Sequence, residues 1–192
     1  MYKSLIAVAV TLLVLDLRVP HIDAPVTNAA VWHALGTLSP KLLIFLASFV
    51  MIGFFWIGHH LIFWTIERSN RWLMWVNLAF LFPLVCMPFA TAFLGDYPSN
   101  GVAASVYMAD VVLTGLLARA TWSYSVRAKL ISPALSREYV HSMSRRLAHV
   151  MWILVAVAAL APIWPPVSIA AMVAAIAYVV ITTGQRAIVD DP

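Results

Sequence analysis

The chain has 192 residues, of which 63% are hydrophobic and only 10% are charged, and its mean hydropathy is +0.91. A soluble domain is nearer half apolar and a quarter charged, so this composition excludes a soluble globular protein and predicts an integral membrane protein. Each span takes about 20 apolar residues, which leaves no room for a soluble catalytic domain. The sequence contains no phosphate-binding loop, dinucleotide fingerprint or catalytic triad pattern, so we expect no enzymatic activity.

The predicted fold is all-α, with six transmembrane helices in one domain over residues 1–192. The first helix, at residues 4–19, is aliphatic throughout and ends at Pro20. A short amphipathic piece at residues 29–37 is expected to lie at the membrane interface. Further helices are predicted at residues 40–65, 72–95, 102–124, 147–161 and 168–183, with a polar, basic connector at residues 125–146.

The basic residues predict the orientation of these helices. With the N-terminus in the cytoplasm, nine of the twelve Lys and Arg residues fall on the cytoplasmic face, and Arg18 and Lys41 fall on the outer face. This bias follows the positive-inside rule and predicts that both termini are cytoplasmic. The same rule accounts for the isoelectric point near 9.5, so we expect no nucleic acid partner.

One stripe of the first helix combines aliphatic side chains with a single central hydroxyl. At about 100° per residue, Thr11 shares a narrow face with Val8, Leu12 and Leu15. Such a stripe suits a hydrophobic constriction where several chains meet at a symmetry axis. It equally suits a packed helix whose threonine bonds back to its own backbone, and the residues alone favour this second interpretation.

Polar side chains at similar depth in the first three helices predict a buried hydrogen-bonded cluster. Trp56 lies three and four residues before His59 and His60, so each pair shares a helix face. His59 and Asn77 lie equally far from the cytoplasmic ends of their helices, and Ser4 starts near that level. A structural clasp is the favoured interpretation, and a proton-sensing role is the alternative.

Two acidic residues are further candidates. Asp110 lies in the middle of the fourth helix, where it is expected to be protonated or hydrogen-bonded to hydroxyls such as Ser48 or Thr114. Asp16 lies near the outer end of the first helix and would concentrate cations at a pore mouth or pair locally. The histidine spacing matches no zinc motif, so no metal site is expected.

Three motifs resemble the bacterial members of the transmembrane protein 175 family of potassium channels. They are AVAVTLLVLDLRVP, FFWIGHH and NLAFLFPLVCMPFATAFLG, at residues 7–20, 54–60 and 77–95. The resemblance implies a potassium-selective, passive channel in a bacterial inner membrane, with no cofactor and no TVGYG filter. It implies a homotetramer whose first helices line a central pore, with a constriction at Val8, Leu12 and Leu15 and selectivity at Thr11.

The resemblance is incomplete at the start of the first helix. The family signature there is an Arg followed by Phe-Ser-Asp, whereas the aligned residues of this chain are Met1, Tyr2 and Lys3. Two other functions remain open on the residues. One is a proton-linked transporter or proton channel that uses Asp110 and the histidines, and the other is a non-conducting membrane scaffold that uses the stripe as an oligomer seam.

Overall fold

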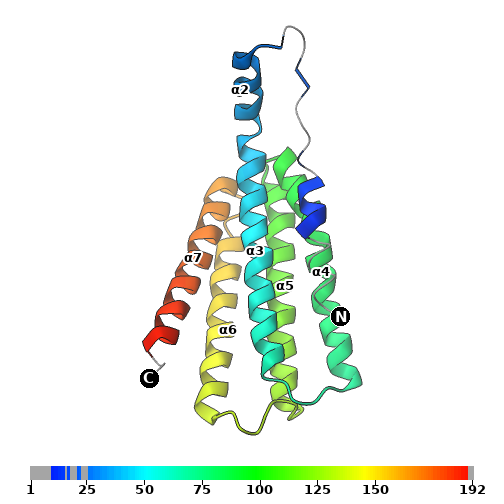
Figure 1. Cartoon of the computed structure of the whole chain (residues 1–192), viewed down its shortest axis with the longest axis vertical. Coiled ribbons are helices and arrows are strands. Elements are labelled where there is room, and N and C mark those ends of the chain that lie inside the picture. The colour runs from blue at the N-terminus through cyan, green and yellow to red at the C-terminus, as the bar shows by residue number, and fades with distance from the viewer. Residues whose placement is uncertain (1–9, 16, 18–20, 23–25, 190–192) are drawn as a thin grey trace.

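The computed structural model describes residues 10–15, 17, 21–22 and 26–189, apart from the side chains of residues 183–189. Over this part of the chain the fold is all-α (Figure 1). Residues 10–15 are helical. The helices that follow are α2 (Asn28–Thr37), α3 (Ser39–Trp64), α4 (Arg71–Asp96), α5 (Gly101–Arg127), α6 (Arg137–Ala158) and α7 (Pro165–Val189).

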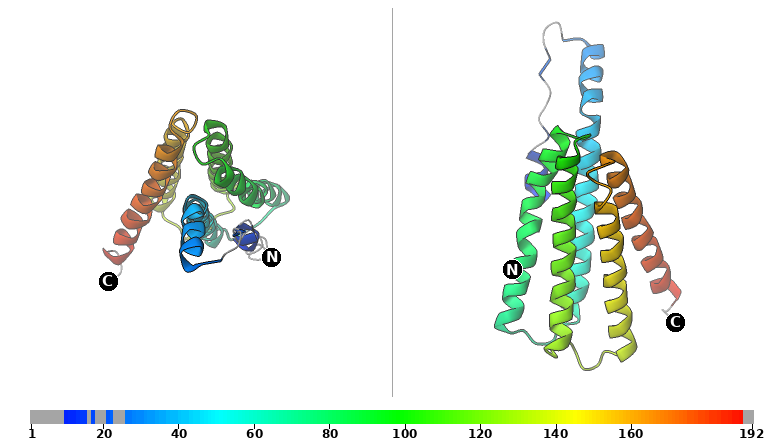
Figure 2. Two further views of the ribbon diagram at one scale, coloured as in Figure 1. Left: turned by 90° about the horizontal axis from the view of Figure 1, so that it is seen from above. Right: turned by 180° about the vertical axis from the view of Figure 1, so that it is seen from behind.

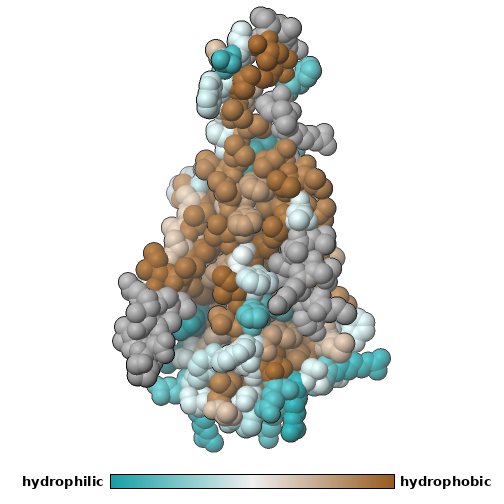
Figure 3. Space-filling model, in the orientation of Figure 1, coloured by the Kyte–Doolittle hydropathy of each residue, from teal (hydrophilic) through white to brown (hydrophobic). Residues whose placement is uncertain are grey.

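Several of the described helices have the length and composition of membrane spans. They are α3, α4, α5 and the part of α7 at Pro165–Thr182, each with a mean hydropathy between 1.7 and 2.1. Figure 3 shows apolar side chains over most of one face of the molecule, and hydrophilic side chains at the end where α3 meets α4 and α5 meets α6. This division between an apolar body and a polar end is typical of a protein embedded in a bilayer.

The core lies between α3, α4 and α5, and α6 and α7 close it on one side (Figure 2). Tyr107 of α5, Phe80 of α4 and Met51 of α3 are each fully buried there. Leu13, from the short helical segment at residues 10–15, belongs to the same core. In contrast, α2 buries none of its side chains and extends beyond the bundle (Figure 1).

The helices α2, α4, α5 and α6 begin where the sequence supplies a side-chain cap, whereas α3 begins after Leu38 without one. Asn70 Oδ1 accepts a hydrogen bond from the backbone N–H of Leu73 at the start of α4. Asn100 caps α5 in the same way through the N–H groups of Val102 and Ala103. These side chains satisfy amide groups that have no partner within the helix, which is why asparagine is favoured at this position.

The helix α6 begins ten residues before the start that hydropathy indicates. Hydropathy places this helix at residues 147–161, whereas α6 spans Arg137–Ala158 and is capped by Ser136. Its first turns are polar, but they still bury Met143 against Trp122 in a small second core. Hydropathy detects only the apolar part of a helix, so the connector before α6 is shorter than the sequence suggests.

Polar contacts tie neighbouring helices together at both ends of the bundle. At one end, Lys41 of α3 forms an ion pair with Asp96 of α4. At the other end, Ile66 of the α3–α4 connection forms an antiparallel β-bridge with Ile131 of the α5–α6 connection. The N–H of Ser132 donates to the carbonyl of Thr65 at 2.9 Å beside this bridge. The bridge fixes the two connections side by side.

Candidate functional site

The short helical segment at residues 10–15 attaches to the bundle by one face. Leu13 is 1% exposed and lies in the main core, and Val10 packs against that core. At about 100° per residue, Leu15 lies roughly 200° further round the helix than Leu13. The face of this segment that carries Leu15 is therefore turned away from the core that the described helices form.

The described part of the aliphatic stripe lies on that outward face. Leu15 is 72% exposed and Leu12 is 42% exposed, and Thr11, which directly precedes Leu12, is exposed as well. Val8, Ser4 and Asp16, which the sequence also selected, lie outside the described residues. Relative to the described helices, these branched aliphatic side chains and the hydroxyl therefore lie on the surface and not in the core.

The structure divides the polar cluster predicted for α3 and α4 into two parts. His59 Nε2 lies 2.7 Å from Asn77 Oδ1, and both residues are buried. Trp56 and His60 stack on each other with ring centroids 6.0 Å apart, and both are exposed. The buried pair links two helices, whereas the stacked pair lies on the outer surface of α3.

A second buried polar group links three helices and was not anticipated from the sequence. Ser48 Oγ of α3 lies 3.1 Å from the hydroxyl of Tyr107 in α5 and 2.9 Å from Thr91 Oγ1 in α4. All three residues are buried. The sequence does show that these three apolar helices each contain a hydroxyl-bearing residue. It does not show which helix faces which, so the contact could not be predicted.

Asp110 does not meet the hydroxyls that were expected to bind it. Ser48 bonds to the other helices as described above, and Thr114 Oγ1 donates to the backbone carbonyl of Asp110 at 2.8 Å. Asp110 Oδ2 is buried without a hydrogen-bond partner in the part of the chain that the structure describes. The same part contains no group of three or more His, Cys, Asp and Glu residues that could hold a metal ion.

These features define a multi-span integral membrane protein. Apolar helices of spanning length surround buried polar links, and an aliphatic stripe with one hydroxyl is exposed on the surface. The sequence profile of the family described as endosomal/lysosomal potassium channel TMEM175 matches residues 2–88. A potassium channel of Chamaesiphon minutus is 31% identical over 144 residues, which cover 73% of this chain and 70% of that channel. The chain belongs to the TMEM175 family, which is a family of ion channels and not of enzymes.

Two further similarities extend this result. A potassium channel of Streptomyces collinus is 38% identical over 125 residues, which cover 63% of this chain and 59% of that channel. This match therefore spans less than two thirds of the relative. The crystal structure of a lysosomal potassium-selective channel TMEM175 homolog from Chamaesiphon minutus superposes with a TM-score of 0.82 at 26% identity, and it covers 94% of this chain and 93% of that one. The family resemblance found in the sequence is confirmed.

Proposed function

We propose that the protein is a potassium-selective channel that conducts ions passively through a central pore lined by the first helices. The observation that carries this proposal is the outward stripe of residues 10–15, where Leu13 anchors the segment and Leu12 and Leu15 face away from it. In the proposed pore, Val8, Leu12 and Leu15 form the hydrophobic constriction. The hydroxyl of Thr11 helps to select among partly dehydrated ions.

The pore requires several copies of the chain. One helix cannot enclose a conduction path, so closed rotational symmetry must bring equivalent helices to one axis. We propose a homotetramer of subunits with six spans each. The proposed spans are residues 4–19, α3, α4, α5, the apolar part of α6 and α7. The superposition with the Chamaesiphon channel supports this arrangement, because it extends over nearly the whole chain.

The charge distribution supports a position in the bacterial plasma membrane with both termini in the cytoplasm. One end of the bundle carries the basic residues of the α3–α4 and α5–α6 connections and of the first turns of α6. Figure 3 shows this end as hydrophilic. The positive-inside rule places such an end in the cytoplasm. Six spans then return the C-terminus to the same side as the N-terminus.

A flux assay on purified protein in liposomes tests the channel function. We expect potassium to pass faster than sodium and the reversal potential in bilayers to follow the potassium gradient. Thr11→Val is expected to reduce this preference, because it removes the hydroxyl and keeps the shape of the side chain. Thr182→Val is the matched control, since Thr182 is exposed on α7 and bonds back to the carbonyl of Tyr178. Equal reversal potentials for Thr11→Val and the unmodified protein would contradict the role of Thr11.

A proton pathway is the second candidate function. It is favoured by Asp110, whose buried Oδ2 lacks a hydrogen-bond partner in the described part of the chain, inside a membrane-spanning helix. Ionisable residues in that position mark ion and proton pathways in many membrane proteins. A pH-gradient assay without potassium separates the two candidates, because proton uptake that is lost in Asp110→Asn would favour this one. Liposomes that pass neither ion would favour a membrane scaffold.

A further inference from the structure

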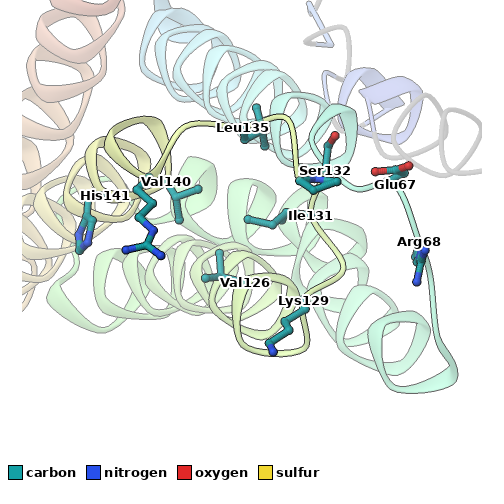
Figure 4. A pocket seen from close by; sticks show the side chains of 11 residues that line it. Glu67, Arg68, Val126, Lys129, Ile131, Ser132, Leu135, Val140 and His141 are labelled. Carbon is teal, nitrogen blue, oxygen red and sulfur yellow. The ribbon is translucent and has the colours of Figure 1, made fainter.

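A cavity of about 510 Å³ opens at the basic end of the bundle. It lies between the α3–α4 connection, the α5–α6 connection and the first turns of α6 (Figure 4). Ile131 and Val126 lie near its middle, Glu67 and Arg68 lie on one side, and His141 lies on the other. The β-bridge between Ile66 and Ile131 holds the two connections that form its walls. The cavity is thus built by hydrogen-bonded backbone and is not a gap between independent loops.

The charges around this cavity favour an anion. Arg68, Lys129 and Arg137 contribute three positive charges and Glu67 contributes one negative charge, so these four residues give the lining a net charge of +2. The N-terminus of α6, a helix of 22 residues, begins at Arg137 and adds the positive end of its dipole. Arginine presents a planar fork of donors that matches the oxygens of a phosphate group.

Lys129 occupies a backbone position that favours glycine. Its φ of 54° lies in the left-handed region. Its N–H donates to the carbonyl of Val126 at 3.1 Å, and the next N–H, of Leu130, donates to the carbonyl of Ser125 at 2.9 Å. This pattern is the Schellman motif at the end of α5, in which the left-handed residue is usually glycine. A lysine here carries a conformational cost and supplies the cavity with a cation that glycine would lack.

The surroundings of the cavity favour an amphiphile as the occupant. Its charged side chains are exposed, whereas Val126, Ile131 and Val140 are half-buried and apolar. Trp64 at the end of α3 and Trp72 at the start of α4 are 76% and 69% exposed at the same end of the bundle. Exposed tryptophans at helix ends mark the headgroup level of a bilayer. The cavity therefore lies where lipid phosphates are concentrated.

We propose that this cavity binds the phosphate of an anionic phospholipid headgroup. The positive charges of Arg68, Lys129 and Arg137 attract the phosphate from different sides of the cavity, and the apolar lining receives the first carbons of the acyl chains. The negative charge of Glu67 repels the phosphate and lowers the affinity of the cavity for it. The proposal does not depend on ion conduction, since it concerns the connections and not the first helix.

Binding is measured by calorimetry on the whole protein in detergent with three probes: dioctanoyl phosphatidylglycerol, dioctanoyl phosphatidylcholine and inorganic phosphate. We expect saturable binding of phosphatidylglycerol and no binding of phosphatidylcholine at the same concentrations. Equal affinity for the two lipids would overturn the proposal. Inorganic phosphate that binds as tightly as phosphatidylglycerol would identify free phosphate as the ligand and would overturn the lipid assignment.

Variants locate the site. Lys129→Gly is expected to weaken phosphatidylglycerol binding severalfold without lowering the unfolding temperature, because glycine suits the left-handed backbone. Arg137→Gln should weaken it as well, and Glu67→Gln should strengthen it. Arg145→Gln is the matched control, since Arg145 is an exposed cation of α6 outside the cavity lining, and its affinity should be unchanged. Unchanged binding in both Lys129→Gly and Arg137→Gln would overturn the proposal.

Discussion

His59 Nε2 donates to Asn77 Oδ1 across 2.7 Å and so joins α3 to α4 inside the bundle. The imidazole ring is also stacked between two aromatic rings, with centroids 4.4 Å from Phe63 and 4.8 Å from Phe80. The contact therefore combines a buried hydrogen bond with close packing on both ring faces. A polar pair enclosed in this way holds two helices in one register, because sliding either helix would bury unpaired polar groups.

Asn77→Ala is expected to destabilise the protein by about 1–3 kcal/mol, since it leaves the buried imidazole N–H of His59 without its partner. Thermal unfolding in detergent measures the change. Asn28→Ala is the control, because Asn28 is exposed at the start of α2. Equal unfolding temperatures for the two variants would show that the contact adds no stability.

The space around three glycines predicts how strongly substitution by alanine would change the stability of the protein. A methyl group at Gly101 would lie 2.4 Å from the backbone oxygen of Pro162, which cannot move aside alone. A methyl group at Gly115 would lie 2.7 Å from Met151 Sδ, which can rotate away in part. Gly53 has no heavy atom within 4 Å of its added methyl group. Alanine should thus cost most at Gly101 and about 1–3 kcal/mol at Gly115, whereas at Gly53 it should leave the stability unchanged or raise it by up to about 1 kcal/mol. Unfolding temperatures in a different order would contradict these contacts.

The contact between Ser48, Thr91 and Tyr107, which links three helices, can be tested with a double-mutant cycle. Ser48→Ala should cost about 1–3 kcal/mol, because it removes the group that contacts the buried hydroxyl of Tyr107. The double variant Ser48→Ala with Tyr107→Phe should lose less than the sum of the two single changes, since it removes both polar groups together. Additive losses in the measured free energies of unfolding would exclude a direct coupling.

The proposed constriction predicts a larger flux when its side chains are shortened. Leu15→Ala and Leu12→Ala should raise potassium uptake into liposomes severalfold, because a wider apolar passage holds water more readily. Val14→Ala is the control, since Val14 is exposed to a similar degree as Leu12 but lies about 160° from it round the helix. Flux that rises equally in all three variants would indicate a general loosening of the segment.

Much of the fold could be predicted because the membrane imposes simple rules on sequence. The apolar runs at residues 40–65 and 72–95 correspond to α3 (Ser39–Trp64) and α4 (Arg71–Asp96). The early start of α6 could not be predicted, because its first turns are polar and are stabilised by a cap and by contacts with α5. Hydropathy reports where a helix meets hydrocarbon and does not report where the helix begins.

Which residues of the candidate site share a helix face could be predicted from the sequence, whereas their role in a pore stays a prediction. The positions of Leu12 and Leu15 follow from helical periodicity alone, and their exposure in the structure agrees with an outward stripe. The link between Ser48, Thr91 and Tyr107 depends on how α3, α4 and α5 are rotated against one another, which no single helix encodes. His59 and Asn77 could be paired because they lie equally far from the cytoplasmic ends of their helices. That argument does not show that His59 is on the buried face of α3 and His60 on the exposed face.

The β-bridge between Ile66 and Ile131 has a mechanical consequence. The carbonyl of Leu130 accepts from the N–H groups of both Glu67 and Arg68, so the bridge rests on backbone atoms that substitutions other than proline leave in place. A force applied to the α5–α6 connection is therefore transmitted to the base of α3. A displacement of one of these connections that left the other in place would have to break these backbone hydrogen bonds.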